Sequence, residues 1–221
     1  MTTTSTTEQL QVRAEPIVTL RGVSWQTYQA LMHDVGDNRA WRIAYDQGIL
    51  EIRMPLPKQE EPKRLLESFI EVIVDELGIE LRSLGALTLE REDLTRAVEP
   101  DTCFYIQNES RVRGQDKINL PDDPPPDLVV ESDYKNSSIN KFKLYAELGV
   151  PEIWRYHQNR IEVYQLIEGQ YEKTQQSPTF SFLPINEIPG LIEQSKTMGQ
   201  RAVVRLFRQR IREILANQSL D

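Results

Sequence analysis

The sequence of 221 residues has little of what several familiar kinds of protein need. Its single cysteine, Cys103, rules out an internal disulfide framework and fits the reducing cytoplasm. Its two histidines, His33 and His157, lie far apart and lack the spacing of a histidine metal site. No apolar run approaches the ~20 residues that cross a bilayer. We therefore expect a cytoplasmic protein with no membrane partner.

Positive charge is also scarce. Lysine and arginine number 26 against 34 aspartates and glutamates, which gives a net charge of −8. A protein that holds a long DNA duplex usually has a basic surface, so this balance argues against tight non-specific binding of DNA. It leaves room for a local basic groove, and it fits a site rich in carboxylates that needs a cation.

The distribution of polar and apolar residues indicates one main domain with two extensions. The N-terminal stretch MTTTSTTEQLQVRAEP is polar and lacks the basic and apolar regions of a secretory signal. We expect a disordered arm over 1–16, a domain over 17–192, and an amphipathic helix within 193–221 that packs on or extends this domain. A single domain suits the length of the chain.

Hydrophobic periodicity predicts alternating helices and strands, which favours an α/β (α+β) domain with one mixed central sheet flanked by helices. Pro62 precedes the second expected helix and is tolerated only if it lies in the first turn. The expected elements are helices after Ser24 and over 63–77, 139–148 and 201–215, hairpins around 46–48 and 158–159, strands over 85–92, 101–107 and 127–132, and a looser strand within 170–185.

Two acids bracket the short apolar run in DPPPDLVVES. Strand side chains alternate, so Asp127, Val129 and Glu131 point the same way. Asp127 and Glu131 would be roughly 13 Å apart along a strand and cannot bind one ion together. The best partner for Glu131 is Asp101, at the edge of another apolar strand. If these strands are neighbours, the two carboxylates can bind Mg²⁺ or Mn²⁺, which prefer oxygen ligands.

Basic side chains are expected near these acids. Lys141 lies in the first turn of the helix that follows the strand of Glu131, where it could orient an attacking water or lower the pKa of that water. Glu60, at the entry to an earlier helix, is a candidate further acid, or simply an acid favoured by the helix dipole. The loop between the two acidic strands carries the residues that we expect to contact DNA, Arg111, Arg113 and Lys117.

This arrangement is that of the PD-(D/E)XK nucleases. Over about residues 18–190, the sequence resembles the Uma2-type family of putative restriction endonucleases, formerly a domain of unknown function. The motifs that carry the resemblance are MPLPKQEE, VEPDTCFYI, PPDLVVES and KFKLYAELGVPEIWRY. The resemblance implies a restriction-endonuclease-like core in which Asp101 and Glu131 are metal ligands.

The sequence departs from the pattern of that superfamily in two places. The catalytic lysine usually lies two residues after the glutamate, where this chain has Asp133. The resemblance implies that the lysine has moved to the following helix, as Lys141, with Lys135 and Lys143 as alternatives. A His-Glu pair often found at the first helix reads Gln59-Glu60, which keeps the glutamate only.

Other notable residues have structural interpretations. Asp127 suits a turn, Cys103 a buried strand, and Tyr145, Trp154 and Tyr156 a packed core. The arginines of the last helix fit a solvated face, with a DNA or dimer contact as the alternative; they are Arg201, Arg205, Arg208, Arg210 and Arg212.

The resulting hypothesis is a Mg²⁺-dependent endonuclease that hydrolyses phosphodiester bonds in nucleic acid, with DNA as the expected partner. A homodimer would suit a duplex, which offers two strands to cut. One alternative is a catalytically silent binding or assembly protein with the nuclease fold. Another is a metal-dependent hydrolase of a small phosphoester.

Overall fold

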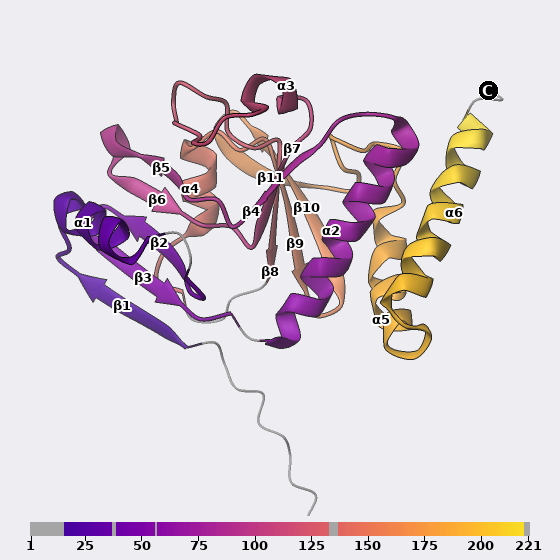
Figure 1. The fold of residues 1–221 in the computed structure, drawn as a ribbon, viewed down its shortest axis with the longest axis horizontal. Coiled ribbons are helices and arrows are strands. Elements are labelled where there is room, and N and C mark those ends of the chain that lie inside the picture. Colours follow the sequence, from indigo (N-terminus) through magenta and orange to yellow (C-terminus); the bar gives the residue numbers. More distant parts are fainter. Residues whose placement is uncertain (1–15, 37–38, 56, 133–136, 219–221) are drawn as a thin grey trace, which may run out of the picture.

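The computed structural model of the chain describes residues 16–36, 39–55, 57–132 and 137–218. The expected arm over 1–16 therefore lies, apart from its last residue, outside the described residues. Figure 1 shows the arrangement. The helices are α1 (Trp25–Val35), α2 (Pro57–Leu77), α3 (Glu109–Val112), α4 (Lys141–Glu147), α5 (Ile188–Met198) and α6 (Gln200–Gln218), with 3-10 turns η1 (Glu92–Leu94) and η2 (Ile185–Glu187). The strands are β1 (Ile17–Arg21), β2 (Arg42–Asp46), β3 (Ile49–Arg53), β4 (Arg82–Gly85), β5 (Leu89–Arg91), β6 (Arg96–Val98), β7 (Thr102–Tyr105), β8 (Leu128–Ser132), β9 (Glu152–His157), β10 (Arg160–Ile167) and β11 (Gln170–Thr174).

These strands form two sheets. The larger sheet has the order β11-β10-β9-β8-β7-β4, and it is mixed because β8 and β9 run parallel. The smaller sheet, β1-β3-β2-β6-β5, is antiparallel. The expected mixed α/β class is confirmed, but the expectation of a single sheet was incomplete. Strands β4 and β6 have four and three residues, too few for a period to be read from the sequence.

Helices cover both faces of the larger sheet (Figure 1). Leu128 and Val130 of β8 pack in one core cluster with α2, α5 and α6. Val129, from the same strand, packs in a second cluster with α4. The alternation expected for this strand is confirmed, and it leaves Glu131 on the side of α4.

Helix α2 begins earlier than expected. It starts at Pro57, so Pro62 lies beyond its first turn, and the expectation of a start near residue 63 was wrong. Proline is well suited to the first helical position, because the N–H of any residue there has no partner within the helix and proline has no N–H to leave unpaired. This explains a start at Pro57. The predicted apolar face is confirmed, since Phe69, Ile70 and Ile73 are fully buried.

Both predicted hairpins are present. The turn between β2 and β3 has positive φ at Gln47 and Gly48, and the turn between β9 and β10 has it at Gln158 and Asn159. Two consecutive residues of positive φ suit the right-handed twist of the strands that they join. Ser24 caps α1 by accepting from the N–H of Thr27 at 3.1 Å, as its position predicted.

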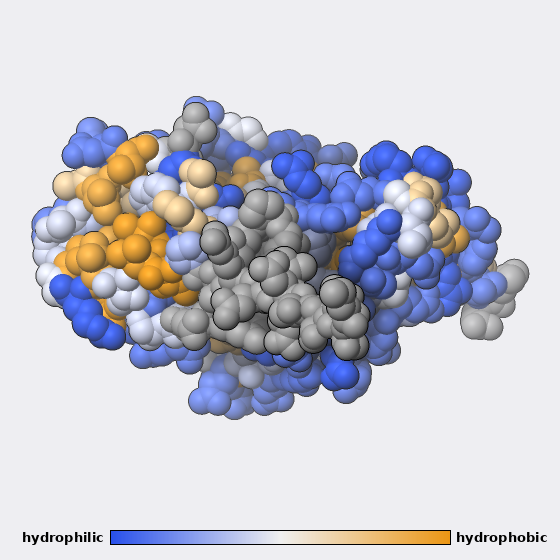
Figure 2. Space-filling model, turned by 90° about the horizontal axis from the view of Figure 1, so that it is seen from below, coloured by the Kyte–Doolittle hydropathy of each residue, from blue (hydrophilic) through white to orange (hydrophobic). Residues whose placement is uncertain are grey.

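The face of the molecule seen in Figure 2 is largely polar outside the residues drawn in grey. Figure 2 shows apolar side chains gathered towards the end of the molecule that holds the smaller sheet. There the edge strand β1 exposes Val18 and Leu20, at 55% and 43% of their surface. Among the described helices, none combines the length and the apolar character that crossing a membrane requires.

Candidate active site

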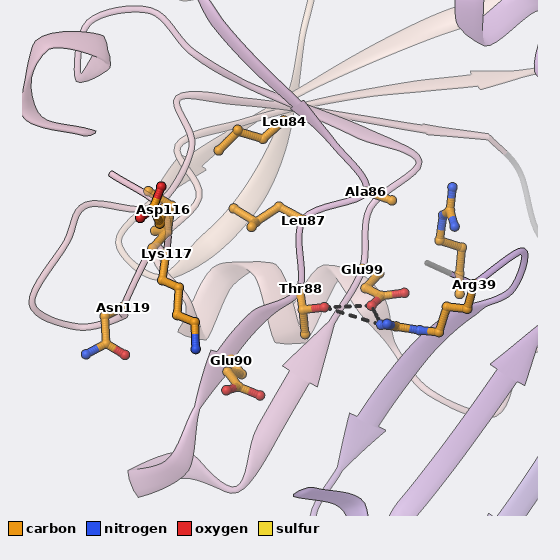
Figure 3. Close-up of a pocket in the computed structure, with 12 residues that line it drawn as sticks. Arg39, Leu84, Ala86, Leu87, Thr88, Glu90, Glu99, Asp116, Lys117 and Asn119 are labelled. Atoms are coloured by element: carbon orange, nitrogen blue, oxygen red, sulfur yellow. Dashed lines mark hydrogen bonds and ion pairs between the residues drawn. The ribbon is translucent and has the colours of Figure 1, made fainter. Parts of the chain in front are cut away.

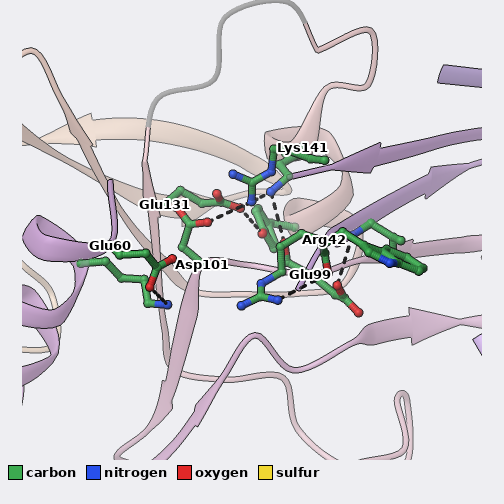
Figure 4. A network of polar contacts seen from close by, with 11 residues as sticks. Arg42, Glu60, Glu99, Asp101, Glu131 and Lys141 are labelled. Carbon is green, nitrogen blue, oxygen red and sulfur yellow. Dashed lines mark hydrogen bonds and ion pairs between the residues drawn. The ribbon is translucent and has the colours of Figure 1, made fainter. Parts of the chain in front are cut away.

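The pairing of β7 with β8 brings the two predicted acids together. These strands are antiparallel, with Thr102 opposite Val130 and Cys103 opposite Val129. Continuing this register by one residue places Asp101 opposite Glu131, and side chains of directly opposite residues are close neighbours on one face of a sheet. Figure 4 shows both carboxylates beside one another, with Lys141 reaching towards them. Both acids are buried, with 7% and 3% of their surface exposed.

The two oxygens of Glu131 have different surroundings. Oε1 accepts a hydrogen bond from Nζ of Lys141 at 2.7 Å and a short one from the hydroxyl of Tyr145. Oε2 is buried and has no hydrogen-bond partner among the residues that the structure describes. Because a buried carboxylate oxygen without a partner is costly, this atom is the one best suited to bind a further group.

Asp101 is paired with a cation from the smaller sheet. Its Oδ1 accepts from Nη2 of Arg53, at the end of β3, at 2.9 Å. Arg53 is itself buried, so the pair is largely shielded from solvent. Asp101, directly before β7, and Glu131, on β8, therefore meet at the boundary between the two sheets.

Lys141 is positioned by the start of α4. Its ammonium group also donates to the backbone oxygen of Glu99 at 3.2 Å, in addition to its bond to Glu131. Asn140 caps the helix by accepting from the N–H of Lys143 at 3.2 Å, and Lys143 is exposed. Of the three candidate lysines, Lys141 is the one seen at the acids; Lys135, like Asp133, lies outside the described residues.

Tyr145 is a site residue that the sequence interpretation assigned to the core alone. It is fully buried on α4, one turn after Lys141, and its hydroxyl reaches the same oxygen of Glu131. Burial raises the pKa of its hydroxyl far above its usual value, and the charges of Glu131 and Asp101 raise it further, so the group stays a donor. The spacing of Lys141 and Tyr145 on one helical face was a usable signal in the sequence.

Glu60 lies at the first turn of α2 and forms an ion pair with Lys63 at 3.2 Å. Figure 4 includes it in the view of the acids. Within the described parts of the chain, no group of three or more His, Cys, Asp and Glu side chains could hold a metal ion. Glu60 thus does not complete a third carboxylate ligand beside Asp101 and Glu131, and its assistance remains a prediction.

The residues expected to contact DNA are spread over one loop. Arg111 is exposed on α3, and Arg113 forms an ion pair with Glu109 at 2.5 Å. Lys117 is exposed and lines a cavity with Glu99. Their binding role remains a prediction.

Asp127 is a turn residue, as expected, because its carboxylate accepts from the N–H groups of Ile106 and Asn108 at 2.7 and 3.0 Å.

Comparison with known proteins identifies the family. Residues 25–195 match the family Uma2, described as putative restriction endonuclease. The chain is also similar to a solved structure from Anabaena variabilis ATCC 29413, described as a putative nuclease belonging to DUF820. The two chains are 15% identical with a TM-score of 0.54, over 82% of this chain and 99% of that one, a likeness that shows the fold. None of the curated proteins compared with the chain matches it. Because the family match covers well over half of the sequence, the chain belongs to the Uma2 family of putative restriction endonucleases.

Proposed function

We propose that the chain is a nuclease that hydrolyses phosphodiester bonds in nucleic acid, DNA being the expected substrate, with the help of Mg²⁺ or Mn²⁺. Family and fold point to a nuclease. The observation that carries the proposal is the state of Glu131, whose Oε1 is held by Lys141 and Tyr145 while its buried Oε2 has no partner among the described residues.

Asp101 and Glu131 would hold the cation. Two carboxylates suit an ion of this class, because Mg²⁺ is commonly bound by one or two protein carboxylates together with waters and substrate phosphates. When bound, such a cation polarises a phosphoryl oxygen and stabilises the charge of the leaving group. The side chains present therefore fit the group, although no third acid joins them among the described residues.

The remaining roles belong to basic side chains and Glu60. Lys141, held at 2.7 Å from Glu131, would orient the attacking water through its ammonium protons, and Glu60 would assist from α2. Arg111, Arg113 and Lys117 would contact the substrate backbone. A homodimer and a cytoplasmic location complete the proposal; the buried, free Cys103 is compatible with that location.

A second candidate is a binding protein that keeps the fold without catalysis. It is favoured by one observation: each acid already has a cation from the chain itself. Lys141 pairs with Glu131 at 2.7 Å, and Arg53 pairs with Asp101 at 2.9 Å. Such a balanced cluster can stand without a metal, whereas removal of one partner would leave a buried charge.

Calorimetric titration of Mn²⁺ separates these two functions. The nuclease proposal expects binding that is lost in Glu131→Gln and retained in Glu152→Gln. Glu152 is a matched control because it is equally buried but lies beside Leu128, at the other end of β8. Plasmid and single-stranded DNA should be cleaved by the wild type and not by Asp101→Asn or Lys141→Met. A wild type that binds no divalent cation and cuts neither DNA would overturn the proposal.

A further inference from the structure

A cavity of about 630 Å³ lies beside Glu99, two residues before Asp101. Its walls come from the connection between β4 and β5, the loop around Lys117, and the segment before and at the start of β2. Figure 3 shows Leu84 and Leu87 on one wall, with Lys117 and Asn119 across from Glu90 and Glu99. Cavities of roughly 300–1,000 Å³ are typical of sites for drug-sized ligands, a class of size that includes a nucleotide.

The cavity adjoins the candidate active site through two residues. Glu99 lines it, precedes Pro100 and Asp101, and accepts from Lys141 through its backbone oxygen. Arg42 lines it and also lines a second, very small cavity together with Arg53 and Lys141. A group that occupied the larger cavity would therefore lie beside the acids.

Arg42 is the basic residue at this junction, and its donors are largely unused. It is partly buried, and among the described residues its guanidinium makes one long hydrogen bond, from Nη1 to the backbone oxygen of Trp41 at 3.4 Å. Figure 4 shows it beside Glu99 and Asp101. Neighbouring arginines each have a carboxylate partner: Arg39 with Glu99, Arg53 with Asp101, and Arg96 with Asp46.

The sheet itself gives Arg42 no stabilising role. In the pairing of β2 with β3 it stands directly opposite Arg53, and like charges in opposite positions destabilise a pair of strands. A partly buried guanidinium with open donors is costly in the absence of an acceptor. Its planar donors match the oxygens of a phosphate, which would supply that acceptor.

The other walls offer what the rest of a nucleotide needs. Leu84 and Leu87 present apolar surface for the face of a base. The carboxylate of Glu90, which accepts from the hydroxyl of Tyr28 at 3.2 Å, can accept from the amino group of a base. Lys117 adds a second positive charge at the rim. This combination suits an unpaired nucleotide, because a paired base has its hydrogen-bonding edge occupied.

We infer that this cavity receives one nucleotide of the substrate with its base unpaired, and that Arg42 binds the phosphate between this nucleotide and the acids. The inference rests on the proposed function and adds to it the form of the substrate. The enzyme acts on a strand that is single at this point, rather than on a continuous duplex.

Fluorescence anisotropy with labelled DNA tests the inference without catalysis. The probes are a 12-nucleotide single strand and the blunt duplex of the same sequence, with Ca²⁺ present in place of Mg²⁺. The variants are Arg42→Gln, Ala86→Trp, which fills the cavity from its wall, and the control Arg160→Gln at an exposed position of β10. Thermal melting of each variant shows whether it is folded.

The single strand should bind more tightly than the duplex. Arg42→Gln should weaken its binding about tenfold and reduce the slope of log K against log salt by about 0.7, the value for one phosphate of a single strand. Ala86→Trp should weaken binding with no change in that slope, and Arg160→Gln should change neither. The inference would be overturned if wild type, Arg42→Gln and Ala86→Trp bound the single strand equally. It would also be overturned if all three preferred the duplex to the same degree.

Cleavage assays with Mg²⁺ on the same proteins separate this inference from the proposed function. If no protein cuts while both cavity variants still weaken binding of the single strand, the nuclease proposal fails, and of the inference only the binding of an unpaired nucleotide in the cavity stands. If Glu131→Gln abolishes cutting while Arg42→Gln binds and cuts as the wild type does, the nuclease proposal stands and the inference fails.

Discussion

At the scale of the residue, the unusual feature is a buried carboxylate with two donors at one oxygen, while its other oxygen has no partner among the described residues. Glu131 is 3% exposed, and both of its donors converge on Oε1. A carboxylate can accept about four hydrogen bonds, so a merely structural role would be expected to satisfy both oxygens. The arrangement instead fixes the rotation of the carboxylate and directs Oε2 away from its donors.

Removal of the tyrosine donor should therefore weaken activity more than stability. We expect Tyr145→Phe to remain folded and to lose about tenfold in metal-dependent cleavage, a typical effect of losing a group that orients a ligand. The control is Tyr171→Phe, which removes a partly buried hydroxyl that donates to the backbone oxygen of Val150 at 2.6 Å. Equal cleavage rates of the two variants would contradict a positioning role for Tyr145.

A second prediction at this scale concerns Glu162 on β10, which lies among basic side chains. Burial alone would raise the pKa of Glu162. Hydrogen bonds from Lys173 and Tyr164 and the charge of Arg155 outweigh that effect and hold the pKa at about 2, against an ordinary value of 4.5. A lowered pKa means that this carboxylate stabilises the fold above pH ~4.5 and loses that contribution as the pH falls towards 2.

Urea denaturation of wild type and Glu162→Gln tests whether the charge of Glu162 stabilises the fold above pH ~4.5. The wild type should be the more stable protein at pH 5, and the difference in unfolding free energy should shrink steadily between about pH 4.5 and pH 2. A difference that is constant over this range would show that the basic residues do not act through the charge of Glu162.

At the scale of the element, the start of α4 decides where Lys141 lies, and β3 controls that start. The carboxylate of Glu51 accepts from the N–H and hydroxyl of Ser138, both at 2.6 Å, and from the hydroxyl of Ser137 at 2.6 Å. Glu51 is 5% exposed. The smaller sheet thus holds the turn that leads into the helix of Lys141 and Tyr145.

Glu51→Gln should loosen this turn. The variant keeps one acceptor oxygen but loses the charge, and we expect a loss of about 2–3 kcal/mol in the free energy of unfolding. Hydrogen exchange should increase at the amides from Ser138 to Lys143, while the amides of β9 and β10 stay protected. A variant with unchanged exchange at the start of α4 would show that the turn is held by other contacts.

At the scale of the whole molecule, the C-terminal helix α6 is part of the main core. Phe207 is 2% exposed and packs against Phe69 of α2, with the two rings tilted and their centroids 4.5 Å apart. The division into an arm, a domain over 17–192 and a segment over 193–221 stays a prediction.

Several arginines of α6 form ion pairs with acids on neighbouring helices. Arg208 and Arg212 pair with Glu76, and Arg210 pairs with Glu187.

Packing should outweigh these ion pairs. Phe207→Ala removes a buried ring and should cost about 3–5 kcal/mol of unfolding free energy. Arg212→Ala removes the ion pair of a largely exposed arginine with Glu76, which keeps Arg208 as a partner, and should cost about 1 kcal/mol or less, with most of that loss absent at high salt. Chemical denaturation at low and high salt measures both. An Arg212→Ala variant as destabilised as Phe207→Ala would mean that α6 is held mainly by charge.

Much of the local structure could be read from the sequence because it depends on neighbours in the chain. The apolar face of α2, the cap at Ser24 and the turns at Gly48 and Asn159 each rest on a few adjacent residues. The missed strands are β1, β4 and β6. Strands β4 and β6 are too short to show a period, and the three strands exist through pairing with β3, β7 and β2, respectively. The second sheet went unrecognised for the same reason.

The sequence by itself determined which acids and which lysine were worth attention. The length of strand between Asp127 and Glu131 excluded them as joint ligands and left Asp101 as the candidate partner of Glu131. Only the tertiary structure decided that β7 and β8 pair in the register that sets Asp101 opposite Glu131. It also decided that Arg53 and Tyr145 contact those acids and that Arg42 lines a small cavity with Arg53 and Lys141. Register and sheet order arise from contacts between segments distant in the chain, and a single sequence contains no direct record of those contacts.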